Sequence, residues 1–92
     1  MTKFEVFLSK EATKQLHALP EDRQENIKKH LRELESEPYR ARPNADIKKL
    51  FTRDKELYRL RAGDYRAVYF IEGKNVIVTE IFHRSEGYDW IE

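Results

Sequence analysis

The sequence contains no cysteine, which excludes disulfide bonds, thiol catalysis and cysteine-ligated zinc or iron–sulfur sites. It has only three glycines, isolated from one another, so the chain has no glycine-rich phosphate-binding loop. No run approaches the roughly 20 apolar residues of a membrane-spanning helix, and the charged N-terminal segment is unlike a signal peptide. Together these absences predict a cytoplasmic protein without membrane contact.

Charged residues make up 38% of the 92 residues, and apolar residues make up 39%. This length supports a single hydrophobic core, so we expect one domain spanning residues 1–92. The net charge of +1 conceals a basic middle third, since residues 38–66 contain nine Lys and Arg against four Asp and Glu. Such a segment favours a local anionic partner, although a merely solvated surface gives the same pattern.

The N-terminal third predicts one strand and two helices. Apolar and polar residues alternate from Phe4 to Leu8, as in a half-buried strand. Ser9 fits the N-cap position of a short helix that reaches about His17, and Pro20 fits the first turn of a second helix. The apolar stripe of the second helix consists of Ile27, Leu31 and Leu34.

The remainder predicts a sheet. Residues 37–46 contain two prolines and lack apolar periodicity, which indicates a loop. Strand-forming residues then occupy positions 47–51, 57–62, 65–71 and 76–82. The sequence therefore predicts an α+β fold with an N-terminal strand, a two-helix hairpin and a three- to four-stranded antiparallel sheet. The aromatic C-terminal tail is expected to fold back onto the body.

The turn at residues 63–64 sets the predicted register of the arginines. With Gly-Asp as a two-residue hairpin loop, Arg61 lies opposite Arg66, and Arg59 shares their face because strand side chains alternate. Like charges placed opposite each other destabilise a strand pair by up to about 1 kcal/mol, which suggests a role beyond folding. Surface cations whose stems cover apolar sheet area are the alternative.

Continuing a regular register into the last strand places Ile81 opposite Arg66 and His83 on the arginine face, followed by Arg84. The same register places Glu80 among core residues. Glu80 must therefore lie at an edge, or a bulge must shift the pairing.

Arginine suits phosphate because its planar guanidinium donates paired hydrogen bonds and keeps its charge. Metal chemistry is poorly supported because the three histidines are far apart, and Ser85 beside His83 lacks the surroundings of a serine nucleophile. Metal-free cleavage of RNA needs a base for the 2′-OH, cations for the developing charge and an acid for the leaving 5′ oxygen. Aromatic side chains can stack on the bases.

The segments YRLRAGDYRAVY and HRSEGY, joined by an apolar strand, resemble the RelE/ParE toxin superfamily, in particular its RelE branch of mRNA interferases. The resemblance implies the RelE-like fold. It also implies a toxin of a type II toxin-antitoxin system that cleaves mRNA in the ribosomal A site without metal or other cofactors. The products would carry a 2′,3′-cyclic phosphate.

The resemblance also implies roles for particular residues. Arg59, Arg61 and Arg66 match the basic residues of the hairpin, and His83 matches a histidine that acts in proton transfer. The implied catalytic residues are Arg59, Arg61, Arg66, His83, Arg84 and Tyr88, with Tyr88 stacking on the substrate base. Within the basic third, the candidate RNA-binding residues are Lys48, Lys49 and Arg53. Arginine stands where relatives can use lysine as general base, so the base remains unassigned.

The expected partners are a cognate RelB-like antitoxin, the ribosome with its RNA, and mRNA. We expect a monomer when free and a heteromer with the antitoxin. A ParE-like inhibitor of DNA gyrase, without nuclease activity, is the alternative of the same fold. A catalytically silent binding protein is a third possibility.

Overall fold

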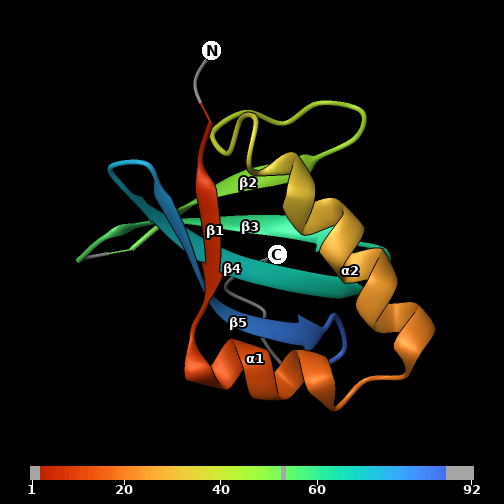
Figure 1. The fold of residues 1–92 in the computed structure, drawn as a ribbon. Coiled ribbons are helices and arrows are strands. Elements are labelled where there is room, and N and C mark those ends of the chain that lie inside the picture. The colour runs from red at the N-terminus through yellow and green to blue at the C-terminus, as the bar shows by residue number, and fades with distance from the viewer. Residues whose placement is uncertain (1–2, 53, 87–92) are drawn as a thin grey trace.

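The computed structural model of the protein describes residues 3–52 and 54–86. Five strands form one mixed sheet with the order β1-β5-β4-β3-β2, and two helices cover one of its faces (Figure 1). The elements are β1 (Glu5–Leu8), α1 (Lys10–His17), α2 (Glu21–Glu33), β2 (Asp46–Phe51), β3 (Glu56–Ala62), β4 (Tyr65–Glu72) and β5 (Asn75–His83). The predicted α+β fold is confirmed, with β1 pairing in parallel with β5 and the other four strands antiparallel.

The two helices begin where the sequence indicates. The Ser9 Oγ atom accepts a hydrogen bond from the Ala12 backbone N–H at 3.0 Å and donates one to the Thr79 carbonyl at 3.0 Å. Ser9 therefore caps α1 and ties it to β5 at the same time. Pro20 occupies the N-cap position of α2, one residue before the predicted first turn. Figure 1 shows α1 lying along β5 and α2 crossing toward β3.

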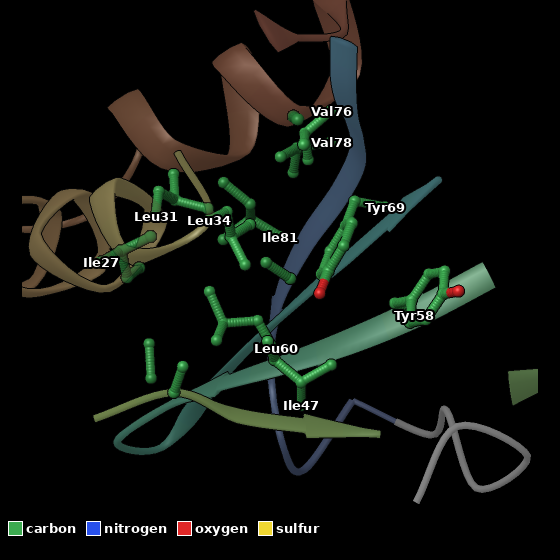
Figure 2. Packing of buried hydrophobic residues seen from close by; sticks show 14 of the residues in the cluster. Ile27, Leu31, Leu34, Ile47, Tyr58, Leu60, Tyr69, Val76, Val78 and Ile81 are labelled. Carbon is green, nitrogen blue, oxygen red and sulfur yellow. The ribbon is translucent and has the colours of Figure 1, made fainter. Parts of the chain in front are cut away.

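The main core lies between the helices and the sheet (Figure 2). The stripe of Ile27, Leu31 and Leu34 is buried there. Tyr69 is also fully buried, and its hydroxyl donates a hydrogen bond of 2.7 Å to the Pro38 carbonyl. This bond anchors the loop that leads into β2, and burial raises the pKa of Tyr69.

The β3–β4 hairpin has the predicted register. Gly63 adopts φ of 64°, a conformation that favours glycine, and the turn places Arg61 opposite Arg66 and Arg59 opposite Val68. The opposition of two arginines is therefore confirmed.

The pairing of β4 with β5 departs from the regular prediction. The register shifts between Val68 and Tyr69, so that Arg66 pairs with Phe82 rather than with Ile81. This bulge turns Glu80 away from the helices and leaves Ile81 buried in the core. The physical reason is that the regular register would bury the Glu80 carboxylate among apolar side chains, which is costly. The sequence left two alternatives for Glu80, a position at the sheet edge or a bulge in the pairing. The structure has the bulge.

Candidate anion-binding face

Basic residues gather on the sheet face that points away from the two helices. Arg59 and Arg61 come from β3 and Arg66 comes from β4, on the face opposite to the helix-facing Leu60. Lys48 of β2 lies beside Arg59 in the register. Three neighbouring strands therefore bring four of the predicted cationic side chains to one face.

Two of these arginines are buried, whereas the third is open to solvent. Arg59 and Arg66 are 7% and 5% exposed, while the Arg61 side chain is 54% exposed. A small apolar cluster of Leu50, Leu57, Val68 and Phe82 shares this face. Burial of a guanidinium group is costly unless it is paired, so each buried arginine requires a partner.

Arg66 is held by its own turn. Its Nη1 atom donates hydrogen bonds to the Gly63 carbonyl at 2.9 Å and to the Tyr65 carbonyl at 3.0 Å. The turn glycine thus has two functions, since it permits the tight hairpin and presents a carbonyl to the arginine. The position of this guanidinium group is fixed before any ligand arrives.

Arg59 is less completely satisfied. Its Nη2 atom lies 3.6 Å from Oδ1 of Asp46, and within the described residues its buried Nε atom has no hydrogen-bond partner. Arg61 shares the same carboxylate, with its Nη1 atom 3.9 Å from Oδ2 of Asp46. One half-exposed carboxylate therefore pairs with two arginines, and the buried Nε–H group of Arg59 has no acceptor among the described residues.

Arg84 lies at the turn end of the hairpin. Its backbone N–H donates to the Asp64 carbonyl at 2.8 Å, and its Nε atom lies 3.5 Å from Oδ1 of Asp64. The Arg84 side chain is 60% exposed. This pair fixes the residue after β5 beside the β3–β4 turn, close in the fold to Arg66.

His83 does not join the arginines. The bulge pairs it with Tyr65, so its side chain lies on the helix-facing side, where the two rings meet edge to face at 5.2 Å. Its Nδ1 atom lies 2.8 Å from the Ser85 hydroxyl. Together with Gln15 and Glu86, it lines a hollow of about 200 Å³ beside α1. The predicted convergence of His83 with the arginines is wrong because it assumed a regular strand.

The two predicted lysines lie on opposite faces. Lys48 shares the arginine face, whereas Lys49 pairs with the helix-facing Tyr58 and forms an ion pair of 2.8 Å with Glu56. The hydrogen bond from Lys49 to Glu56 raises the pKa of the lysine. The predicted residues Arg53 and Tyr88 lie outside the described residues.

Sequence reasoning missed the two aspartates that accompany the arginines. Asp46 pairs with Arg61 across the β2–β3 ladder, and Asp64 occupies the hairpin turn. Their opposite charge was the available signal, but the ion pairs depend on a β2–β3 register that the sequence does not specify. Within residues 3–52 and 54–86, no group of three or more acidic or histidine side chains could hold a metal ion.

The family follows from comparison with known proteins. A family model described as the ParE toxin of the type II toxin-antitoxin system parDE matches residues 6–88. The chain belongs to this family, and therefore to the RelE/ParE superfamily of toxins in type II toxin-antitoxin systems. A comparison with curated proteins gave no match. In the described part of the chain, no helix is long and apolar enough to cross a membrane.

This chain is similar in structure to RelE toxins solved in complexes with RelB. The archaeal RelE–RelB complex from Pyrococcus horikoshii OT3 contains a chain with 28% identity and a TM-score of 0.77, covering 94% of this chain and 100% of that one. The RelB–RelE complex from Methanococcus jannaschii gives 26% identity, a TM-score of 0.69 and coverage of 94% and 99%. The RelBE2 complex from Mycobacterium tuberculosis, at 24% identity, has the same fold, with a TM-score of 0.74 and coverage of 90% and 100%.

Proposed function

We propose that this toxin is a ribosome-dependent, metal-independent endoribonuclease that cleaves mRNA in the ribosomal A site. The observation that carries the proposal is the row of Arg59, Arg61 and Arg66 on one sheet face, with two of the guanidinium groups buried. Opposing Arg61 and Arg66 costs the hairpin some charge repulsion, which a phosphate between them would neutralise.

The arginines supply electrostatic stabilisation. Attack of the RNA 2′-OH on the adjacent phosphate places additional negative charge on the phosphoryl oxygens. Arg66, fixed by its turn carbonyls, and the exposed Arg61 are suited to receive this charge. Arg59 adds a third positive charge on the same face. In this proposal Arg84 holds a neighbouring phosphate, Lys48 attracts the RNA backbone, and Tyr88 stacks on the substrate base.

The family model gives specific support to a second function. Because the match is to a ParE toxin model, a gyrase inhibitor without nuclease chemistry is the competing proposal. The two functions make different use of the arginine face. A nuclease requires the arginines for turnover, whereas a gyrase inhibitor requires only a surface that binds the enzyme.

The antitoxin is part of the proposal in both cases. The similar RelE chains from P. horikoshii and M. jannaschii were solved in complex with RelB. We infer that this toxin is likewise neutralised by a cognate RelB-like antitoxin. The free toxin would be monomeric and would form a heteromer with the antitoxin.

A paired assay distinguishes the two functions. Purified toxin is added to ribosomes programmed with a defined mRNA, and in parallel to DNA gyrase with relaxed plasmid. We expect mRNA cut at the A-site codon without added metal, and unchanged supercoiling. Intact mRNA together with blocked supercoiling would replace the nuclease proposal with the gyrase proposal.

A further inference from the structure

The arginine face contains the cations for cleavage, but its arginines cannot serve as the base. A guanidinium group has no lone pair for a proton and does not deprotonate near neutral pH. His83, the residue expected to move protons, lies on the opposite sheet face against Tyr65. A lysine is ordinarily protonated at neutral pH, whereas a carboxylate is ordinarily ready to accept a proton. A carboxylate near the arginines is therefore the better candidate for the proton acceptor of the 2′-OH.

Asp46 occupies a suitable position. It is the first residue of β2, directly opposite Arg61, and its two carboxylate oxygens face Arg59 and Arg61 at 3.6 and 3.9 Å. These distances exceed the roughly 2.7–2.9 Å of tight charge-assisted hydrogen bonds. Its side chain is also 53% exposed. The carboxylate is therefore close to both guanidinium groups and open to a bound hydroxyl.

Two other carboxylates lie nearby in less suitable positions. Glu80 pairs with Val68, so its backbone lies two strand spacings, about 10 Å, from the backbone of Arg59, whereas Asp46 lies on the strand next to Arg59. Asp64 lies in the hairpin turn and pairs with Arg84. Asp46 lies next to both of the β3 arginines that would hold the reacting phosphate.

We propose that Asp46 is the general base of this toxin, an assignment that rests on the proposed ribonuclease function. The Asp46 carboxylate takes the proton of the RNA 2′-OH as the 2′ oxygen forms its bond to phosphorus. The bond from phosphorus to the 5′ oxygen breaks, and the leaving oxygen takes a proton from water. Asp46 then returns its proton to solvent, so protons and charge balance.

If Asp46 has only a structural role, its removal is expected to change the cleavage rate in the opposite direction. If the carboxylate serves only as the counter-ion of the buried Arg59, it competes with substrate phosphate for both arginines. Its removal would then lower the free energy of unfolding, because Arg59 loses its carboxylate, but the folded variant would bind and cleave RNA at least as well as the wild type because both arginines are free for phosphate. The two roles therefore differ in the sign of the change in cleavage rate.

The test measures the single-turnover rate of mRNA cleavage on programmed ribosomes and, separately, the affinity for ribosomes carrying an uncleavable message with a 2′-deoxy nucleotide at the cut site. For Asp46→Asn we expect a rate loss of about 10²-fold or more, with affinity unchanged or higher. Asp46→Glu, which restores a carboxylate, should recover part of the rate. Asp22→Asn is the matched control because Asp22 forms an exposed ion pair of 3.2 Å with Arg23 on α2.

Chemical rescue provides a second readout. In Asp46→Ala, added formate should increase the cleavage rate because a free carboxylate can enter the vacated position, and the same formate should not rescue Arg61→Ala. Cleavage by Asp46→Asn at or above the wild-type rate would overturn the assignment while leaving the ribonuclease function intact. So would the absence of formate rescue in a folded Asp46→Ala protein. A wild-type protein that never cleaves mRNA would instead refute the ribonuclease function itself.

Discussion

The arginines differ in how much the fold depends on each of them. Arg61 is half-exposed and lies 3.9 Å from the Asp46 carboxylate, whereas Arg66 is buried and bonded to two backbone carbonyls. Charge repulsion alone predicts that removing Arg66 stabilises the hairpin. The two hydrogen bonds predict the opposite sign, because hydrogen bonds from charged groups contribute about 1.5–3 kcal/mol each.

We therefore predict that Arg61→Ala lowers toxicity and mRNA cleavage by about 10²-fold while changing the free energy of unfolding by less than about 0.5 kcal/mol. Arg66→Ala should lower both toxicity and stability, the latter by about 2 kcal/mol. Growth arrest on induction and urea denaturation measure the two quantities. Full toxicity of a folded Arg61→Ala protein would contradict the phosphate role of this face.

The buried hydroxyl of Tyr69 makes the stability of the protein depend on pH in the alkaline range. Burial raises the pKa of its hydroxyl in the folded state, so the folded protein retains a proton that the unfolded chain loses above the ordinary tyrosine pKa of about 10. Its contribution to stability is complete below that pH. It is lost as pH rises further, by up to about 1.4 kcal/mol per pH unit.

Urea denaturation between pH 9 and 11 should therefore show a steeper fall for the wild type than for Tyr69→Phe. At neutral pH the variant should be less stable by about 1–2 kcal/mol, because the Pro38 carbonyl loses its hydrogen bond. Parallel pH curves for the two proteins would contradict this account of the buried hydroxyl.

Single-residue roles could be predicted from sequence only where local geometry determines them. The opposition of Arg61 and Arg66 follows from a two-residue turn, and Ser9 follows from capping chemistry. The contacts of Asp46 and the orientation of His83 depend on how distant strands align, which side-chain type does not indicate.

At the scale of elements, the cap of α1 connects a helix to the sheet. Ser9 bonds both the Ala12 N–H and the Thr79 carbonyl, which lies at the β5 bulge. We predict that Ser9→Ala lowers the free energy of unfolding by about 1–2 kcal/mol, because a cap and a tertiary bond are lost together.

Ser36→Ala is the matched control, since the Ser36 hydroxyl is exposed, donates to the nearby Glu33 carbonyl at 3.1 Å and accepts from the Arg42 Nη2 atom only at 3.5 Å. The control should change stability by less than about 0.5 kcal/mol. If thermal or urea unfolding showed equal losses of unfolding free energy in the two variants, the predicted contribution of the two Ser9 hydrogen bonds would be wrong.

The strands and helices were predicted to within one or two residues, but the register of β5 was not. Alternation of apolar residues along 76–82 is compatible with two pairings that differ by one residue. Only Glu80 distinguished them, since one register buries its carboxylate in the core. The bulge therefore decides which side chains reach the arginine face, and sequence periodicity does not contain that information.

At the scale of the whole molecule, the charge distribution favours an extended partner. The net charge is only +1, while the strands and loops of residues 38–66 carry the positive excess. An antitoxin that covers this segment, or displaces the C-terminal tail, would inhibit the toxin in either proposed function. A chain that orders on binding can cover such a surface at once.

Hydrogen exchange of the toxin with and without its antitoxin tests this inhibition. We expect slower exchange in residues 59–66 or a change in residues 83–91 on complex formation. If neither segment changes in protection, the inhibitory surface lies elsewhere.

The central claim is that the arginine face promotes attack of an RNA 2′-OH on its own phosphate. The most direct measurement uses ribosomes programmed with two messages that differ only by a 2′-deoxy nucleotide at the cut site. We predict that the all-RNA message is cleaved without metal to a 2′,3′-cyclic phosphate, and that the 2′-deoxy message remains intact. Cleavage of the 2′-deoxy message, or of neither message, would contradict the account.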